Sequence, residues 1–143
     1  MTISSDLSVV GLRIGLDGTV EDVVLAADES GGYMDAVRRA IGCRWIERVQ
    51  LTPYVTMWLD EDGMPDFGDA ERFSAAVNRK ATLIAARFGL THQPYFGNAV
   101  FVGGDARICG LSVERLDALR TLAALLGVLV DLAGDAKTAG GAR

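Results

Sequence analysis

Apolar and polar residues alternate in six short stretches of the chain, and a period of two is typical of β-strands with one buried face. In the first stretch, Leu12, Ile14 and Leu16 alternate with polar or small neighbours. Asp17-Gly18 then offers the chemistry of a tight two-residue turn, which predicts a hairpin. Strands are predicted for residues 7–16, 20–26, 44–51, 54–59, 98–102 and 107–110. The six strands therefore form three pairs joined by short turns.

Between and after these pairs, apolar residues recur three or four positions apart, which predicts helices with one apolar stripe. The helices are predicted for residues 33–41, 69–88 and 113 to about 132. Gly42 stands where a helix-ending glycine is expected, and Ser112 is a favourable residue for capping the start of the last helix.

The middle helix has two possible forms. Phe73, Val77, Ala81, Ile84 and Phe88 form a continuous apolar stripe, which favours one helix over residues 69–88. Alternatively, Asn78 caps a second helix that starts at the next residue, because an asparagine side chain accepts hydrogen bonds well at that position. The pattern alone leaves both forms open.

The order of elements is β-β-α-β-β-α-β-β-α, which predicts a single-domain α+β fold. Strand pairs with short turns predict a mostly antiparallel sheet, and we expect the helices to pack on one face of it. The domain is predicted to span residues 1–133. Small and polar residues predict a flexible C-terminal tail over residues 134–143.

The charge of the chain excludes several classes of protein. Its 143 residues include 14 basic and 19 acidic side chains, a formal net charge of −5. This charge is too mild for a mimic of DNA, and its sign is wrong for an unaided binder of the phosphate backbone. Nucleic acid is therefore not an expected partner.

Cysteine and histidine are too sparse for an evident metal site. Cys43, Cys109 and His92 are scattered, whereas a structural zinc site takes about four such ligands. We expect no metal and no other cofactor. The start of the chain lacks a secretory pattern, and the apolar run 122–132 is too short to cross a bilayer. We therefore expect a cytoplasmic protein without a membrane partner.

Four polar residues are the main candidates for binding a ligand: Asn78, Arg79, Thr82 and Asn98. Asparagine and threonine are poor choices inside a helix unless a cap or a contact uses them. The amide of Asn98, just before a strand, either reads a ligand or holds a turn, and Arg79 offers a cation to an anionic group. Capping alone also explains Asn78.

Tyr54 and Trp58 are four residues apart in one predicted strand and share a face of it. Core packing is the ordinary interpretation of such a pair. The alternative is a platform on which a base or another ring stacks, so both residues join the candidate ligand site.

Two turns offer further chemistry. Gly31-Gly32 precedes a helix, where backbone N–H groups can hold a phosphate, although plain turn chemistry is the simpler interpretation. The cluster 60–62 of three acidic residues offers oxygen ligands to a divalent cation, but it lacks the spacing of a calcium loop. A solvated turn at the end of a strand explains it better.

The last predicted helix is apolar over an unusually wide arc. Leu125, Val128 and Leu132 widen its main stripe. A helix of this kind is either buried in the core or shared with a second chain, and for a protein of this size we favour a homodimer or higher homo-oligomer.

Four short motifs span the middle half of the chain: Gly42 followed by Trp45-Ile46-Glu47, Asp60-Glu61-Asp62-Gly63, Asn78 with Ala81-Thr82, and Gly97-Asn98-Ala99-Val100. On these motifs the chain resembles a small uncharacterised family of bacterial, phage and plasmid proteins, a domain of unknown function. The resemblance implies a mobile-element setting and no known activity. Many small phage proteins of such families counter host defence by sequestering a signal or blocking a defence enzyme.

Three functional hypotheses follow. The first is a non-enzymatic binding protein whose residues near Asn78 and Asn98 hold a small anionic molecule, such as a nucleotide signal, in counter-defence. The second is an interaction module that inhibits or adapts a host protein through the last helix or an edge strand. The third, a hydrolase, has the least support, because the sequence offers neither a nucleophile–base pair nor a set of metal ligands.

Overall fold

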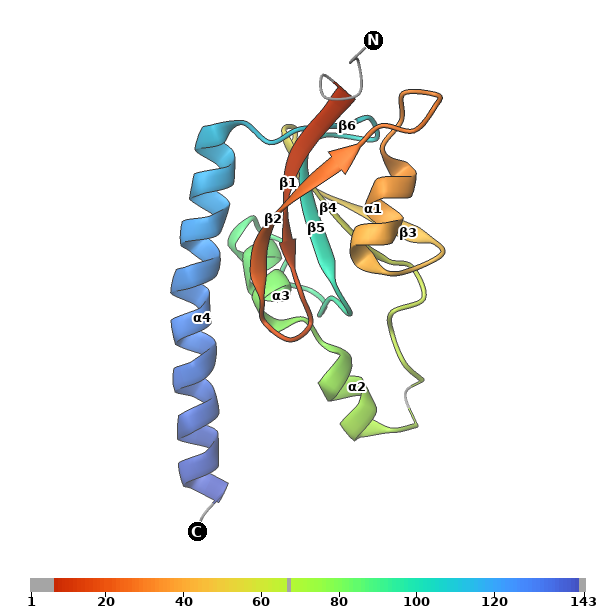
Figure 1. Ribbon diagram of the computed structural model, residues 1–143. Coiled ribbons are helices and arrows are strands. Elements are labelled where there is room, and N and C mark those ends of the chain that lie inside the picture. The colour runs from red at the N-terminus through yellow and green to blue at the C-terminus, as the bar shows by residue number, and fades with distance from the viewer. Residues whose placement is uncertain (1–6, 67, 142–143) are drawn as a thin grey trace.

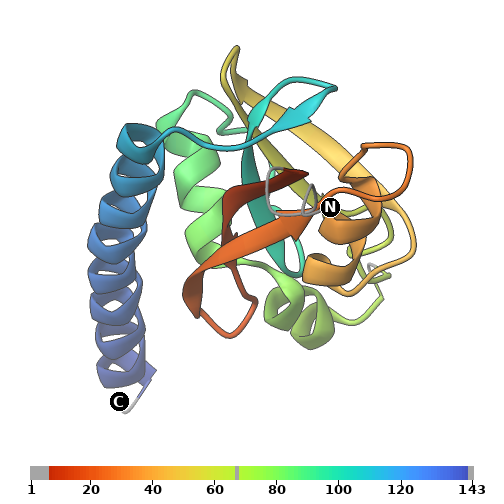
Figure 2. The ribbon, with the colours of Figure 1, turned by 45° about the horizontal axis from the view of Figure 1, so that its top comes forward.

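The computed structural model describes residues 7–66 and 68–141, which form a six-stranded sheet with helices packed around it (Figures 1 and 2). The strands are β1 (Ser8–Ile14), β2 (Val20–Ala26), β3 (Ile46–Thr52), β4 (Val55–Asp60), β5 (Ala99–Gly104) and β6 (Ile108–Cys109). The helices in the described ranges are α1 (Met34–Ile41), α2 (Ala70–Ala76), α3 (Arg79–Arg87) and α4 (Val113–Gly141).

The strands pair in the order β2-β1-β5-β4-β3, and β6 pairs with the end of β5. Every pairing is antiparallel. The three hairpins of the sequence prediction are present, and β5 joins the first two of them by lying between β1 and β4. The predicted α+β fold with a mostly antiparallel sheet is confirmed.

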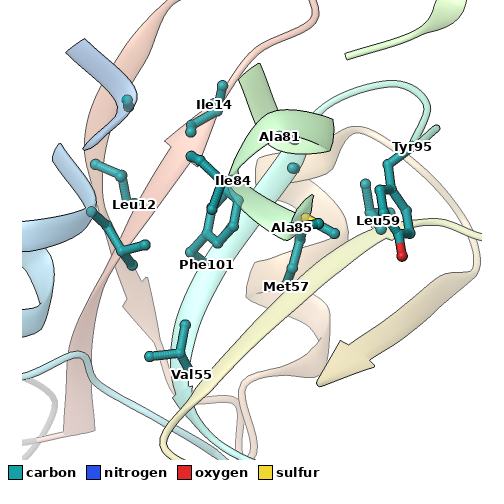
Figure 3. Packing of buried hydrophobic residues seen from close by; sticks show 13 residues of the cluster. Leu12, Ile14, Val55, Met57, Leu59, Ala81, Ile84, Ala85, Tyr95 and Phe101 are labelled. Atoms are coloured by element: carbon teal, nitrogen blue, oxygen red, sulfur yellow. The ribbon is translucent and has the colours of Figure 1, made fainter. Parts of the chain in front are cut away.

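One face of the sheet carries α3 and α4, and the main core lies there (Figure 3). Leu12, Met57 and Phe101, from three neighbouring strands, are fully buried on this face. Ile84 of α3 and Leu119 of α4 pack against them. Burying a large apolar side chain stabilises the fold by about 1.5–3 kcal/mol, so this layer contributes much of the stability of the domain.

The opposite face carries α1, so the expectation that all helices pack on one face is wrong. Val37 and Ile41 of α1 are buried against Trp58, Val100 and Val102. The physical reason lies in the two central strands, β4 and β5, whose first five residues are all buried. A strand with apolar side chains on both faces needs cover on both.

The predicted middle helix is two helices. α2 ends at Ala76, and α3 begins at Arg79 after an extended residue, Val77. Asn78 is the N-cap of α3, and its side chain accepts a hydrogen bond from the N–H of Ala81. The second of the two forms left open by the sequence is therefore correct.

The last helix, α4, begins as predicted, with the hydroxyl of Ser112 accepting a hydrogen bond from the N–H of Arg115. It runs to Gly141, well past the predicted end near residue 132. The alanines at positions 133, 136 and 139 favour a helix, whereas the glycines at positions 134, 140 and 141 do not. Flexibility of residues 134–143 stays a prediction, and residues 142–143 lie outside the described ranges. Among the described helices, none has the length and apolar character to span a membrane.

Candidate functional site

A cleft of about 670 Å³ lies where the β1–β2 turn meets α2 and the start of α3. Figure 1 shows these three segments together at the lower end of the sheet. The cleft is lined by Leu16, Asp17, Gly18, Ala70, Glu71, Ser74, Ala75, Val77, Asn78, Arg79 and Lys80. Its volume falls within the range of about 300–1,000 Å³ that is usual for small-molecule sites.

The break between α2 and α3 shapes one wall of this cleft. Val77 forms an isolated β-bridge with Phe96, and the N–H of Asn78 donates to the carbonyl of Tyr95 at 2.8 Å. The N–H of Gly97 in turn donates to the carbonyl of Ala76 at 3.0 Å. Because residues 76–78 pair with residues 95–97, they cannot continue α2, and a new helix, α3, begins at Arg79.

The side chain of Asn78 is fully engaged inside the protein. Only 2% of its surface is exposed. Its Nδ2 donates to the carbonyls of Ile14 (3.0 Å) and Gly97 (2.8 Å), and its Oδ1 accepts from the N–H of Ala81 (3.1 Å). Asn78 therefore ties β1, the loop before β5 and α3 together. A contact from its amide to a ligand stays a prediction, and the structure gives the residue a structural role.

Arg79 and Lys80 bring positive charge to the cleft. Arg79 is exposed, and within the described residues its guanidinium has no hydrogen bond or ion pair. The ammonium of Lys80 donates to the carbonyl of Gly18 at 2.6 Å. The Lys80 chain also lies against α4, since a Cβ placed on Gly127 would be 3.1 Å from its Cε. Arg79 is thus the cation of the cleft that is available to a ligand. Lys80 instead connects α3 to the β1–β2 turn.

Asp17 and Glu71 add carboxylates to the same cleft. The N–H of Thr19 donates to the carboxylate of Asp17 at 3.0 Å, and this bond lowers the pKa of Asp17 below its usual value. The cleft therefore offers both a cation and acceptors of hydrogen bonds, which suits a polar ligand that carries an anionic group and N–H or O–H donors.

Thr82 and Asn98 bond to backbone groups elsewhere. The hydroxyl of Thr82 accepts from the N–H of Tyr95 at 2.9 Å. Asn98 accepts from the N–H of Leu16 and donates to the carbonyl of Ile41, each at 2.9 Å. These two residues do not line the cleft. Of the four predicted polar residues, the structure brings Asn78 and Arg79 to the cleft and gives the other two positions in the scaffold.

Trp58 and Tyr54 do not come together as a stacking platform. Trp58 is buried beneath α1, where its indole Nε1 has no partner among the described residues. Tyr54 lies in the β3–β4 turn and is 60% exposed, and the guanidinium of Arg115 sits 4.6 Å from its ring centroid. Core packing therefore accounts for Trp58, and a cation–π contact accounts for Tyr54.

The turn Gly31-Gly32 has its amide groups occupied. The carboxylate of Asp28 accepts from the N–H groups of Ser30 (2.9 Å) and Gly32 (3.0 Å), and the N–H of Gly31 donates to the carbonyl of Asp28 (3.0 Å). The plain turn interpretation fits these bonds. The N–H groups at these three positions already have acceptors within the turn, so none of them is free to bind a phosphate.

The acidic turn and the cysteines are equally ordinary. The carboxylate of Asp60 accepts from the N–H of Asp62 at 2.9 Å, as in a capped turn. Cys43 and Cys109 are both free thiols. Among the described residues, no group of three or more acidic, cysteine or histidine side chains is placed to hold a metal ion.

Sequence reasoning did not single out Asp17, Gly18, Glu71 or Lys80 as parts of one site. The β1–β2 turn and α2 are more than fifty residues apart in the chain, and no local pattern signals their approach. The only signal was the acidic, glycine-containing turn itself, which the sequence equally explains as a hairpin connection.

The fold and the cleft define a small α+β domain with a mixed-charge cleft beside the β1–β2 turn. A comparison with known families matches residues 15–124 to a domain of unknown function, DUF3846, which is more than half of the chain. The chain belongs to this family, so the predicted resemblance to an uncharacterised domain of unknown function is confirmed in this coarse form. A search of curated proteins found no match. A search of solved structures found none either.

Proposed function

We propose that this protein binds a small anionic molecule of nucleotide type in the cleft between the β1–β2 turn, α2 and α3, without turning it over. The observation that carries the proposal is Arg79, an exposed cation in a cleft of ligand size, with no partner among the described residues. An arginine guanidinium binds phosphate and carboxylate groups in a bidentate manner, so it supplies the anionic subsite.

The remaining lining supports a nucleotide rather than a bare anion. Asp17 and Glu71 repel a simple anion, but they accept hydrogen bonds from the amino and hydroxyl groups of a base or a sugar. The apolar residues Leu16, Ala75 and Val77 offer contact surface to a ring. In this arrangement the phosphate lies at Arg79 and the rest of the ligand lies toward the β1–β2 turn.

The biological role that we propose is sequestration of a nucleotide signal by a cytoplasmic protein of a phage or plasmid, in counter-defence. Its support is the analogy with small phage proteins of uncharacterised families, and it depends on ligand binding. Sequestration requires that the protein bind the nucleotide but not that it catalyse a reaction. A site with one free arginine in a scaffold held by backbone hydrogen bonds is consistent with this role.

A thermal-shift experiment tests the binding proposal. At a ligand concentration 100 times Kd, binding stabilises the folded state by about 2.7 kcal/mol, which raises the melting temperature by several degrees. We expect such a shift with at least one member of a panel of mono-, di- and cyclic nucleotides. Arg79→Ala is expected to abolish the shift. Arg87→Ala, at the other end of the same helix, is the matched control and should retain it. The proposal fails if no nucleotide shifts the melting temperature or if Arg79→Ala responds like the wild type.

The alternative function is an interaction module for a host protein, and the specific observation that favours it is an open sheet edge. β2 and β3 end the strand order β2-β1-β5-β4-β3 on its two sides, and Val24 of β2 is 71% exposed. An extended segment of another protein pairs with such an edge through main-chain hydrogen bonds. Capture of one host protein by the wild type, and its loss with a proline at Val24, would favour this function over ligand binding.

A further inference from the structure

A second cavity lies where β3 and the end of β4 meet the loop before β5. Its volume is about 250 Å³, below the range of about 300–1,000 Å³ that is usual for drug-sized ligands, so it suits a small chemical group. Of the described residues that line it, three are acidic and none is basic: Glu47, Leu59, Asp60, Glu61, Met64, Gln93, Pro94, Tyr95 and Phe96. We call this cavity the acidic cavity.

The sheet and the turn after β4 bring two carboxylates to the acidic cavity. Glu47 of β3 is the cross-strand neighbour of Leu59 of β4, so their side chains share one face of the sheet. This is the face of the main core, to which Leu59 belongs. The N–H of Glu61 donates to the carbonyl of Trp45 at 2.9 Å, which holds the turn beside the start of β3.

The negative charge of the acidic cavity is not compensated within the described chain. Glu47 and Glu61 are exposed, and among the described residues neither carboxylate has a hydrogen bond or an ion pair. Asp60 differs, because its carboxylate accepts from the N–H of Asp62 at 2.9 Å. Exposed carboxylates alone are ordinary on a protein surface. Like charges gathered around one small cavity nevertheless favour a bound cation.

Tyr95 brings a polar group without a partner to the same cavity. Its ring packs with Leu59 in the main core (Figure 3), and only 4% of the residue is exposed. Within the described chain its hydroxyl has no hydrogen-bond partner, although most buried polar groups in proteins have one. The hydroxyl is not among the unpartnered side-chain atoms sealed off from solvent, which belong to Gln50 and Trp58. It is therefore open to the acidic cavity that Tyr95 lines.

The hydroxyl of Tyr95 is neutral at physiological pH. Burial raises the pKa of Tyr95 above its usual value, and the negative charge of the nearby Glu47 raises it further. A neutral hydroxyl accepts a hydrogen bond from a cation through its oxygen and can donate its own proton to a carboxylate. The cavity thus combines a buried neutral acceptor with carboxylates at its surface.

We propose that the acidic cavity binds the protonated primary amine at the end of an alkyl chain. An ammonium group has three donors and no acceptor, so it can bond to the Tyr95 oxygen and to the carboxylates of Glu47 and Glu61 together. Its methylene groups contact the apolar part of the lining, as the stem of a lysine does on a protein surface. This apolar part consists of Leu59, Met64, Pro94 and Phe96.

Other cations fit the acidic cavity less well. Among the described residues, no group of three or more acidic, cysteine or histidine side chains is placed to hold a metal ion. A planar guanidinium prefers the two oxygens of one carboxylate, whereas the acceptors here come from three separate segments. The acidic cavity shares no lining residue with the cleft around Arg79, so amine binding does not depend on the proposed nucleotide binding.

Titration of the full chain with butylammonium tests the site. In nitrogen–proton correlation NMR spectra, we expect the amide signals of Glu47, Leu59, Glu61 and Tyr95 to shift and to reach saturation. Butanol, a chain of the same length without the charge, should leave these signals in place at the same concentrations. The signals of Asp17 and Arg79, in the other cleft, should not respond to the amine.

Three variants test the assigned contacts. Glu47→Gln removes one exposed charge and should weaken butylammonium binding about fivefold, the upper range for an exposed ion pair. Tyr95→Phe removes the hydroxyl, keeps the ring in the core, and should weaken binding about threefold or more. Glu29→Gln, the same change at an exposed residue of the β2–α1 loop, is the matched control and should retain the wild-type affinity.

A blocked lysine, with acetyl and methylamide groups on its main chain, distinguishes two sources of the ammonium group. Tighter binding of butylammonium assigns the cavity to a soluble amine. Binding of the blocked lysine that is at least as tight assigns it to a lysine side chain of a partner protein. Either result supports an alkylammonium site.

Three results overturn the proposal. They are the absence of saturable shifts with both amines, equal shifts with butanol, and wild-type affinity in both Glu47→Gln and Tyr95→Phe. Tighter binding of butylguanidinium than of butylammonium would overturn the choice of an ammonium group. Because these measurements use no nucleotide, their outcome is independent of whether the cleft around Arg79 binds one.

Discussion

The region around Asn78 and Asn98 and the outer side of α4 depart from ordinary surface chemistry in opposite ways. The two asparagines are polar side chains drawn into the protein, and both ends of each amide are hydrogen-bonded to backbone groups. Leu125 and Leu129 are apolar side chains left in water. The first region satisfies its polar groups within the fold, whereas the second leaves apolar side chains exposed to solvent.

This difference shows which unexpected residues point to a binding site and which are explained by the fold. A polar residue in an unexpected position signals a ligand only if its hydrogen-bonding groups are free, and the amides of Asn78 and Asn98 are used by the fold. The candidate ligand contact therefore moves to Arg79, the neighbour whose charge is free within the described chain. An exposed apolar residue carries the opposite signal, because nothing in the fold explains it.

The largest expected effect comes from Asn78→Ala. This change removes an N-cap, worth about 1 kcal/mol, and the amide that donates to the carbonyls of Ile14 and Gly97, which costs about a further 1–3 kcal/mol in all. We expect the free energy of unfolding to fall by about 3 kcal/mol in urea denaturation. Leu125→Glu, at a side chain that is 62% exposed, is the matched control and should change it by less than about 0.5 kcal/mol. An equal fall in the free energy of unfolding in both variants would contradict the structural role that we assign to Asn78.

Asn98→Ala should have a smaller effect, because its side chain is only partly buried. The change removes the bonds to Leu16 and Ile41, which connect β1, α1 and the start of β5. We expect a loss of about 2 kcal/mol, since water can replace part of this hydrogen bonding. A loss of less than about 0.5 kcal/mol would show that Asn98 is dispensable to the fold and would return it to the list of ligand contacts.

The smallest effect concerns a hydrogen-bonded turn in full contact with water. The hydroxyl and N–H of Ser30, with the N–H of Gly32, lower the pKa of Asp28 below its usual value. A lowered pKa in the folded state contributes stability that is present above the unfolded pKa of about 3.9 and is lost as the pH falls through the folded value. Asp28→Asn keeps an acceptor but no longer titrates. Between pH 5 and pH 2 we expect it to lose less stability than the wild type, as followed by urea midpoints, and parallel curves would contradict this.

Much of the sheet could be predicted from the sequence because its signals are local. Alternation placed the strands, and Asp17-Gly18 and Gly42 marked the first turn and the end of α1. In the structure, Gly42 has the positive φ of 84° that such an ending requires, and its N–H donates to the carbonyl of Arg38. The face on which α1 packs was not predictable in the same way, because Trp58 and Met57 are both buried and the pattern of β4 favours neither side.

The candidate site was predicted only in part, for a related reason. Asn78 and Arg79 were recognised from their residue types, but the choice between a cap and a ligand contact depends on the loop 95–97, which is far away in sequence. The approach of Glu71 to the β1–β2 turn has no local signal at all. Contacts of this kind become visible only when the whole sheet is assembled.

The central position of β5 has a consequence for how the chain reaches its folded state. β1 is made early, yet its partner on that side is β5, with Leu12 opposite Phe101 and Ile14 opposite Ala99. During synthesis from the N-terminus, the first hairpin therefore waits with one strand edge open until most of the chain has left the ribosome. Closing so long a loop is slow compared with forming local helices, so we expect the pairing of β1 with β5 to be the late step of folding. The amides of Asn78 and Asn98 connect the end of β1 to the segment just before β5, so we expect their hydrogen bonds to stabilise this pairing once it has formed.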